Sequence, residues 1–332
     1  MSSLPVNFSH VAVSNHKDEL LTLTQSPLPQ IASNQVLIKV AAAGVNGPDL
    51  AQRQGIYPPP PNASPILGLE VSGEVCAVGD EVVQWQVGDR ICALVQGGGY
   101  AQYVSAHQDH CLPLPESISL VQGAALPETL FTVWGNLFQR AKLSSSDTLL
   151  IHGASGGLGN CAIQLAKAFD ATVIVTSGSK EKCQHCLSLG ADHTFEYSSP
   201  TLFNDIYEVT GQHGVSVVFD MAAGDFVNLN LKLLKHEGRM VTVALQRGIT
   251  AQVDVFRLMS KRITWTGSTL RPQPDEMKAN IAADLKQFVL PLLNQGLCLP
   301  HIHRTFDLSE VEKAHQLMLS KAHVGKIVLT VD

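Results

Sequence analysis

The first third of the chain alternates apolar and polar residues in short runs, which is the pattern of half-buried β-strands. Glycine and proline residues separate these runs, as turn residues do. The predicted strands cover residues 35–40, 71–75, 88–91 and 100–104. The pattern therefore predicts a β-rich first part of the fold.

The middle of the chain has near-continuous apolar runs that alternate with helical patterns. These runs cover residues 148–151, 171–176, 193–197, 215–219 and 240–243. Strands of a parallel sheet are buried on both faces, so they have little polar alternation. Strands that alternate with helices form βαβ units. The pattern predicts an α/β fold with a doubly wound parallel sheet.

The tail has mixed character, with two predicted helices and a final strand. The helices cover residues 278–293 and 309–319, and the strand covers residues 325–329. Ser309 and Glu312 have the spacing of a capping box at the start of the second helix. A chain of 332 residues is long enough for about two domains.

Composition excludes several classes of protein. The chain is 45% hydrophobic and 16% charged, with a net charge of −6 and no basic run, so neither a nucleic acid nor an anionic membrane is expected as a partner. No signal-peptide pattern opens it, and no apolar run reaches the roughly 20 residues of a membrane span. Seven scattered cysteines indicate free thiols, so we expect a cytoplasmic protein.

The sharpest motif is the glycine-rich segment 151–159, Ile-His-Gly-Ala-Ser-Gly-Gly-Leu-Gly, between a predicted strand and a predicted helix. Glycines let the backbone approach a pyrophosphate closely, and the helix N-terminus attracts its negative charge. Ala154 stands where the dinucleotide-binding pattern has its first glycine. The motif predicts dinucleotide binding, and the alternative is a structural turn.

The end of the next strand bears on the choice of cofactor. NAD enzymes usually have an acidic residue there, which binds the ribose hydroxyls. Here the sequence continues through Ser179, Lys180, Glu181 and Lys182, and we assign Glu181 to the first turn of the following helix. Hydroxyl and ammonium groups favour a 2′-phosphate, so NADPH is expected. The alternative is that both lysines are ordinary solvated charges.

Several motifs outside the glycine turn resemble the medium-chain dehydrogenase/reductase superfamily over nearly the whole chain. Residues 45–57 and 68–73 look like the signature of its zinc-independent quinone oxidoreductases. Residues 126–128 with Thr132 resemble the entry to the nucleotide domain, and residues 325–329 resemble the closing strand. The proline loop 57–61 suggests the branch of zeta-crystallin and of the tumour-suppressor-inducible quinone oxidoreductase.

This resemblance implies a GroES-like β-rich domain and a Rossmann domain. The GroES-like domain would comprise residues 1–125 and be completed by residues 262–332, and the NADPH-binding Rossmann domain would comprise residues 126–261. The family also implies a homo-oligomer, either a dimer or a tetramer. Residues 264–269 would pair across the dimer.

The resemblance also implies roles for individual residues. Asn46 and Tyr57 would be catalytic, near the nicotinamide and the substrate, although Asn46 could instead cap a helix and Tyr57 could pack on the proline loop. The residues implied to bind the cofactor are Tyr57, Thr132, Ser155, Gly156, Gly157, Leu158, Ser179, Lys182, Tyr197, Leu245, Gln246 and Leu270.

No metal is expected. Zinc-dependent relatives place Cys and His ligands where this chain has Asn46 and Leu69. Cys183 and Cys186 form a C-x-x-C, but within a predicted helix and without a second pair. Residues 107–111 hold two histidines, an aspartate and a cysteine, for which a surface loop is the simpler interpretation.

The expected function is metal-free reduction of a quinone or similar conjugated carbonyl by NADPH. A quinone is a strong electrophile that needs positioning and a donor for its developing oxyanion. One alternative is a reductase of the C=C bond of enoyl or 2-alkenal substrates. A second alternative is a structural protein that binds NADPH with little turnover.

Overall fold

The computed structural model describes residues 4–14 and 20–332. It divides into unit 1, residues 1–131 with 271–332, and unit 2, residues 132–270. The predicted domain boundaries lie after residues 125 and 261. The second boundary lies after residue 270 in the structure and not after residue 261. The cause is that Thr264–Gly267 pairs in parallel with a strand of the unit 2 sheet and stays with that sheet.

Unit 1 is built on a mainly antiparallel sheet with the order β14-β15-β3-β4-β5-β7, in which β14 and β15 pair in parallel and β6 also pairs with β3. A separate hairpin, β1 with β2, precedes it. The strands are β1 (Asn7–Val13), β2 (Leu21–Pro27), β3 (Gln35–Val45), β4 (Glu70–Val78), β5 (Arg90–Leu94), β6 (Tyr103–His107), β7 (Cys111–Pro113), β14 (Ile302–Asp307) and β15 (Lys326–Thr330).

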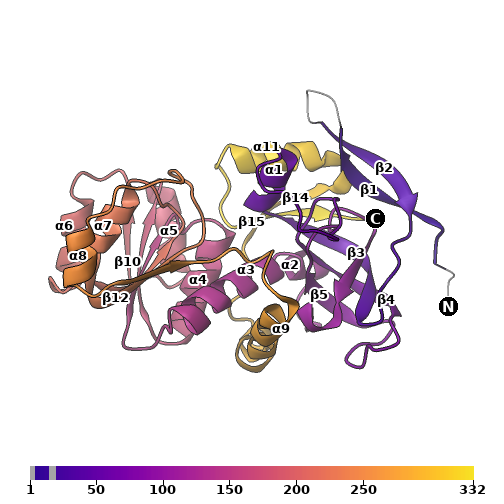
Figure 1. Cartoon of the computed structure of the whole chain (residues 1–332), viewed down its shortest axis with the longest axis horizontal. Coiled ribbons are helices and arrows are strands. Elements are labelled where there is room, and N and C mark those ends of the chain that lie inside the picture. The colour runs from indigo at the N-terminus through magenta and orange to yellow at the C-terminus, as the bar shows by residue number, and fades with distance from the viewer. Residues whose placement is uncertain (1–3, 15–19) are drawn as a thin grey trace. The chain divides into compact units, whose positions relative to one another are not determined.

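The C-terminal strand lies inside this sheet. Figure 1 shows β15 beside β3, although the two are far apart in sequence, and Ile327 pairs with Val45 in antiparallel register. Helix α11 (Val311–Leu319) packs on β14 and β15. The sheet of unit 1 is therefore assembled from both parts of the chain that flank unit 2.

The remaining helices of unit 1 are short or interrupted. They are α1 (Gly47–Arg53), η1 (Gln108–His110), α2 (Leu120–Gly123), α3 (Pro127–Val133, which crosses into unit 2), α9 (Asp275–Asp284), η3 (Leu285–Val289), α10 (Leu290–Asn294) and η4 (Leu308–Glu310). The predicted helix 278–293 is the continuous run of α9, η3 and α10. Its π-helical segment η3 stands just before Pro291, which cannot donate a helical hydrogen bond.

The predicted capping box at Ser309 and Glu312 is wrong. Residues Leu308–Glu310 form a 3₁₀ turn, and α11 follows it with Glu310 at the N-cap position and no side-chain cap. Glu312 instead pairs with Arg53, with 2.9 Å between nitrogen and oxygen. A tertiary ion pair has replaced the local cap.

Unit 2 contains a parallel sheet with the order β10-β9-β8-β11-β12-β13. Numbered within the unit, this is the 3-2-1-4-5-6 order of a Rossmann fold, which confirms the predicted doubly wound sheet. The strands are β8 (Thr148–His152), β9 (Thr172–Ser177), β10 (His193–Glu196), β11 (Val215–Asp220), β12 (Leu234–Thr242) and β13 (Thr264–Gly267). Every residue of β11 is buried, as the apolar run requires.

Helices connect these strands in the βαβ manner. They are α4 (Gly157–Ala168), α5 (Lys180–Ser188), α6 (Leu202–Val209), α7 (Phe226–Leu233) and α8 (Val255–Ser260), while η2 (Trp134–Arg140) precedes β8. Because all six strands run the same way, the loops that follow them emerge at one edge of the sheet. In such folds ligands bind at this carboxyl edge.

Candidate cofactor and acceptor site

The glycine turn joins β8 to α4. Gly156 is the N-cap of α4 with extended backbone, and Gly157 and Leu158 form its first turn. A Cβ on Gly156 would meet nothing within 4 Å. The first N–H groups of a helix lack partners within it, so an open N-terminus after a buried strand is suited to a pyrophosphate.

Two details explain how the motif departs from its pattern. Gly153, one position before Ala154, has a φ of +69° and provides the left-handed conformation. A Cβ on Gly159 would lie 2.3 Å from both Cα and O of Ala154, so this position accepts only glycine. Ala154 is fully buried against the start of the helix.

The residues predicted to bind the adenosine phosphate gather at the ends of β9 and β10. Ser179 is the N-cap of α5, and its hydroxyl accepts from the backbone N–H of Lys182 at 3.4 Å. The Tyr197 hydroxyl lies against Gly178, where an added Cβ would approach it to 2.9 Å. Glu181 lies in the first turn of α5, as expected. A hydrogen bond from Ser179 lowers the pKa of Glu181.

The other predicted cofactor residues are spread over unit 2. Gln246 follows β12, and its Oε1 would lie 3.7 Å from a Cβ on Gly153, so it reaches the glycine turn. Leu245 is 54% exposed beside it. Thr132 is buried in α3, where its carbonyl accepts from Asn136 at 2.8 Å. Leu270 follows β13 and is partly exposed.

In unit 1, Asn46 is held by a buried ion pair. Its Nδ2 donates to Oε1 of Glu70 at 2.9 Å, and its Oδ1 accepts from Nζ of Lys326 at 2.6 Å. Lys326 also pairs with Glu70, and both side chains are at most 5% exposed. Asn46 therefore has both ends of its amide engaged, and its Nδ2 also donates to the carbonyl of Gly44 at 3.5 Å. A ligand would have to replace this long hydrogen bond to receive an N–H of Asn46.

The start of α1 is fixed by Asp49. Its carboxylate accepts from the N–H of Asn46 at 2.8 Å, from the N–H of Gly68 at 3.0 Å and from the hydroxyl of Tyr100 at 3.1 Å. Burial raises the pKa of Asp49 to about 6 against these hydrogen bonds. These contacts give Asp49 a structural role, and Asn46 occupies the N-cap position of α1.

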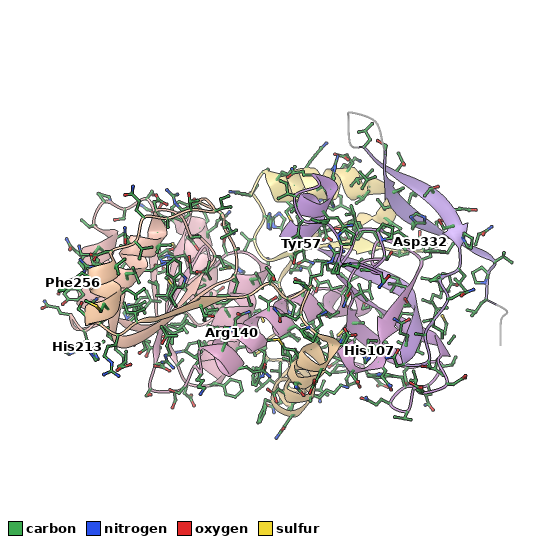
Figure 2. All side chains as sticks on the ribbon, in the orientation of Figure 1. Tyr57, His107, Arg140, His213, Phe256 and Asp332 are labelled. Carbon is green, nitrogen blue, oxygen red and sulfur yellow. The ribbon has the colours of Figure 1, made fainter. Side chains whose placement is uncertain are left out.

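Tyr57 lies in the loop after α1 (Figure 2). The guanidinium carbon of Arg271 is 5.9 Å from the centre of its ring. Arg271 is itself fixed, because it donates to Oε1 of Gln52 at 2.8 Å and to the carbonyl of Gln96. Burial, followed by the charge of Glu128, raises the pKa of Tyr57. Its hydroxyl stays protonated at neutral pH and can donate a hydrogen bond.

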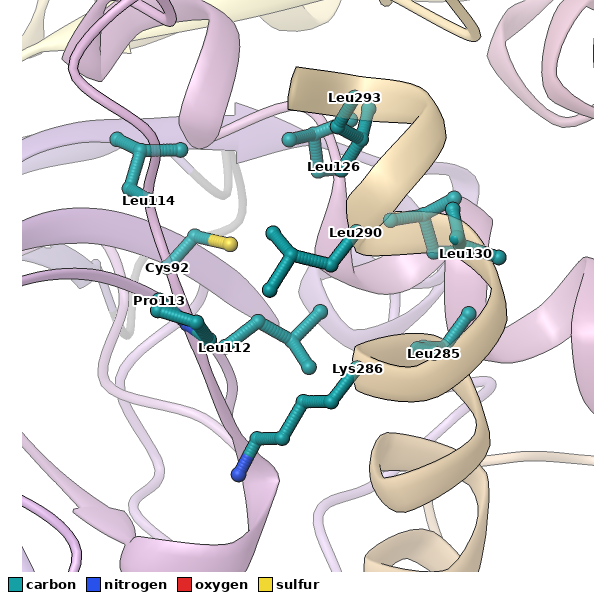
Figure 3. Close-up of a pocket in the computed structure, with 11 residues that line it drawn as sticks. Cys92, Leu112, Pro113, Leu114, Leu126, Leu130, Leu285, Lys286, Leu290 and Leu293 are labelled. Carbon is teal, nitrogen blue, oxygen red and sulfur yellow. The ribbon is translucent and has the colours of Figure 1, made fainter. Parts of the chain in front are cut away.

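Two small cavities lie in unit 1. One is polar and is lined by Leu69, Leu94, Val95, Gln96, His110, Glu128, Arg271 and Lys278. The other, shown in Figure 3, is walled mainly by leucines together with Cys92 and Lys286. Burial raises the pKa of the Cys92 thiol far above neutrality, so this thiol is not a nucleophile at neutral pH. The polar cavity is bordered by more titratable side chains than the leucine-walled cavity.

Comparisons with known proteins now decide the family. Residues 32–116 match the model of the alcohol dehydrogenase GroES-like domain, and residues 157–286 match that of zinc-binding dehydrogenase. Quinone oxidoreductase of Mus musculus is 33% identical over 307 residues, which is 91% of this chain and 90% of the relative. The chain belongs to the medium-chain dehydrogenase/reductase family.

Solved structures agree with this assignment. Quinone oxidoreductase of Escherichia coli, complexed with NADPH, has a TM-score of 0.84 and 26% identity, covering 98% of this chain and 99% of that one. The CurK enoyl reductase has a TM-score of 0.83 and 26% identity, covering 99% and 100%. A GroES-like domain with a Rossmann domain is thereby confirmed, and the protein is an oxidoreductase of the medium-chain family.

Within residues 4–14 and 20–332, no three His, Cys, Asp or Glu side chains are grouped so as to hold a metal ion. Cys183 and Cys186 both lie in α5 as predicted, and Cys186 is fully buried. Across the same residues no helix is long and apolar enough to cross a membrane.

Four residues of the unit 1 site were not singled out from the medium-chain pattern: Glu70, Glu128, Arg271 and Lys326. Glu70, Glu128 and Lys326 lie inside segments that resemble the family, so their positions were available without their roles. Glu70 and Lys326 pair although they are 256 residues apart in the sequence, so no local pattern could predict the pair. Arg271 lies outside all of the segments that resemble the family.

Proposed function

We propose that this oxidoreductase transfers hydride from NADPH to quinones, without a metal ion. The observation that carries the proposal is the carboxyl edge of the unit 2 sheet. There the glycine turn, Ser179, Lys182 and Tyr197 follow neighbouring strands, and β9 ends in Ser177 without a carboxylate. Hydroxyl and ammonium groups suit a ribose phosphate.

The residues of unit 2 fit NADPH. The open N-terminus of α4 would hold the pyrophosphate, and Ser179, Lys182 and Tyr197 would surround the 2′-phosphate. When bound, the nicotinamide supplies a hydride. Gln246, beside Gly153, would contact the dinucleotide where it leaves the glycine turn.

The residues of unit 1 would bind and polarise the acceptor. Among the described residues no hydrogen bond engages the Tyr57 hydroxyl, and its raised pKa keeps it a donor. The amide of Asn46 is a weaker candidate, because the buried ion pair holds it and its Nδ2 also donates to the carbonyl of Gly44. Positioning by these groups, rather than Lewis acidity, would lower the barrier.

The mouse relative and the Escherichia coli structure support a quinone as the acceptor, because both proteins are named quinone oxidoreductase. One observation favours a second candidate, reduction of an activated C=C bond. The CurK enoyl reductase is as similar in sequence as the Escherichia coli enzyme. Both reactions use the same cofactor and donors, and they differ only in the atom that receives the hydride.

The decisive assay measures NADPH oxidation with ortho-quinones and with 2-alkenals, in parallel with NADH and with a chelator. We expect faster turnover with quinones, preference for NADPH and no effect of the chelator. Turnover of alkenals alone would select the second candidate. Tight NADPH binding with no oxidation by any acceptor would select the structural alternative.

Lys182→Ala is expected to raise the Michaelis constant for NADPH by roughly tenfold, the value of one lost charge-assisted hydrogen bond. NADH lacks the 2′-phosphate, so its use should be nearly unchanged. Steady-state kinetics with both cofactors measure this. Lys180→Ala is the matched control, since Lys180 is exposed two residues earlier. Equal losses with NADPH and NADH would contradict the assignment of Lys182.

We further propose a cytoplasmic homo-oligomer, either a dimer or a tetramer. Strand β13 is at the end of the unit 2 sheet, and its Trp265 is 38% exposed. An uncovered edge strand is a template for pairing with a second copy. Analytical ultracentrifugation measures the state, and a monomer at micromolar concentration would contradict the proposal.

A further inference from the structure

Glu128 and Asn46 are held by the same buried carboxylate. The backbone N–H of Glu128 donates to Oε2 of Glu70 at 2.8 Å, while Oε1 of Glu70 accepts from Asn46 at 2.9 Å. Glu128 lies in the first turn of α3. The pair Glu70–Lys326 therefore fixes Glu128 beside Asn46, a residue of the proposed acceptor site.

Within the described parts of the chain, the side chain of Glu128 has no bonding partner. Among the described residues neither a hydrogen bond nor an ion pair engages its carboxyl group, although the residue is only partly exposed. It borders the polar cavity, which has room for about one water molecule. A carboxyl group without partners, at a wall with space for water, is available for proton transfer.

Titratable groups from several elements surround Glu128. They come from α1, from the loop after it, from β4, η1, β15 and α9, and from the segment before α9. These groups are Asp49, Tyr57, Glu70, His110, Lys326, Lys278 and Arg271. Glu70 is already paired with Lys326, and Arg271 and Lys278 donate to backbone carbonyls.

We propose that Glu128 is the proton donor of the reduction, a role that rests on the proposed function. A quinone accepts one hydride from the nicotinamide, which leaves as the oxidised dinucleotide. The reduced acceptor then takes one proton as the O–H bond of Glu128 breaks. The resulting carboxylate regains a proton from water through the polar cavity. Two electrons and two hydrogens reach the quinone.

The environment keeps this acid protonated at neutral pH. Burial, and then the charge of Glu70, raise the pKa of Glu128 to about 8. The donor form therefore predominates below pH 8 and is lost as the pH rises through that value. Activity limited by this proton should fall on the alkaline side. Tyr57, whose pKa is also raised, stays protonated there.

The test is Glu128→Gln, which keeps the shape of the side chain and removes the proton. We expect kcat with the quinone to fall by about 10²-fold, the lower range for general acid catalysis. The alkaline limb of the wild-type pH profile should disappear. Glu116→Gln is the matched control, because Glu116 is exposed in the same unit and should keep wild-type kinetics and the limb.

Two measurements keep the outcomes distinct. The infrared carbonyl band of a protonated carboxylic acid should be present in the wild type at pH 7, lose about half of its intensity near pH 8 and be missing from Glu128→Gln. The dissociation constant for NADPH should be equal in both proteins, which excludes misfolding.

Absence of the band, or unchanged kcat and pH profile in a variant that binds NADPH, would overturn the role of Glu128 alone. Failure of the wild type to oxidise NADPH with any acceptor would overturn the proposed function, and this proposal with it.

Discussion

Lys326→Met is expected to lower the free energy of unfolding of unit 1 by about 3–5 kcal/mol, the cost of leaving one partner of a buried ion pair uncompensated. Lys326 is 4% exposed and Glu70 is fully buried. Without the ammonium group, the Glu70 carboxylate would keep its hydrogen bonds from the amide of Asn46 and the N–H of Glu128 but lose the cation with which it pairs. Acceptor reduction should fall as well.

Hydrogen exchange of the β3 and β4 amides measures this loss, because it reports on unit 1 separately from unit 2. The control is Lys313→Met, which removes an exposed ion pair. Lys313 pairs with Glu310, and the side chain of Lys313 is 68% exposed. Exposed pairs contribute about 0–1 kcal/mol. A loss for Lys326→Met no larger than that of the control would show that Glu70 is not dependent on its partner.

The second large effect concerns the nucleotide turn. Gly159→Ala is expected to destabilise unit 2 by about 1–3 kcal/mol, as overpacking does. Its new Cβ would lie 2.3 Å from backbone atoms of Ala154, and backbone cannot rotate away as a side chain could. The turn must move, so the dissociation constant for NADPH should rise by at least roughly tenfold.

Calorimetry and fluorescence titration with NADPH check the two parts of this expectation. Gly156→Ala provides the contrast, since an added Cβ there meets no atom within 4 Å and φ is −82°. That variant should keep wild-type stability. Equal stability of Gly159→Ala and Gly156→Ala would contradict the claim that close packing of α4 on the turn requires glycine at position 159.

Local pattern was sufficient for much of the fold. The apolar runs at β8, β9 and β11 predict buried parallel strands, because a strand that is buried on both faces has apolar residues at nearly every position. The glycines at 153–159 predict the turn for the same reason, since backbone conformation and close approach are local demands. The hairpin of β1 and β2 was not predicted, because β2 is mostly exposed and its alternation of apolar and polar residues covers only Leu21 to Thr24.

Long-range contacts account for what the sequence could not provide. The strand predicted at residues 100–104 begins at Tyr103, because Tyr100 turns inward and bonds to Asp49. Glu312 joins Arg53 instead of capping its own helix. In the site, Ser179 and Lys182 could be picked out because they follow a strand directly. Glu128 could not, because its chemistry depends on Glu70, Lys326 and Arg271 gathering around it.

The position of β15 has a consequence for synthesis on the ribosome. Unit 2 is one uninterrupted stretch, so it can fold as soon as residue 270 has emerged. The edge of β3 that β15 covers must wait, because Lys326 follows Asn46 by 280 residues. That delay is roughly 15–60 seconds at about 5–20 residues per second. During this time the nascent chain carries an open strand edge, a site for chaperones to shield.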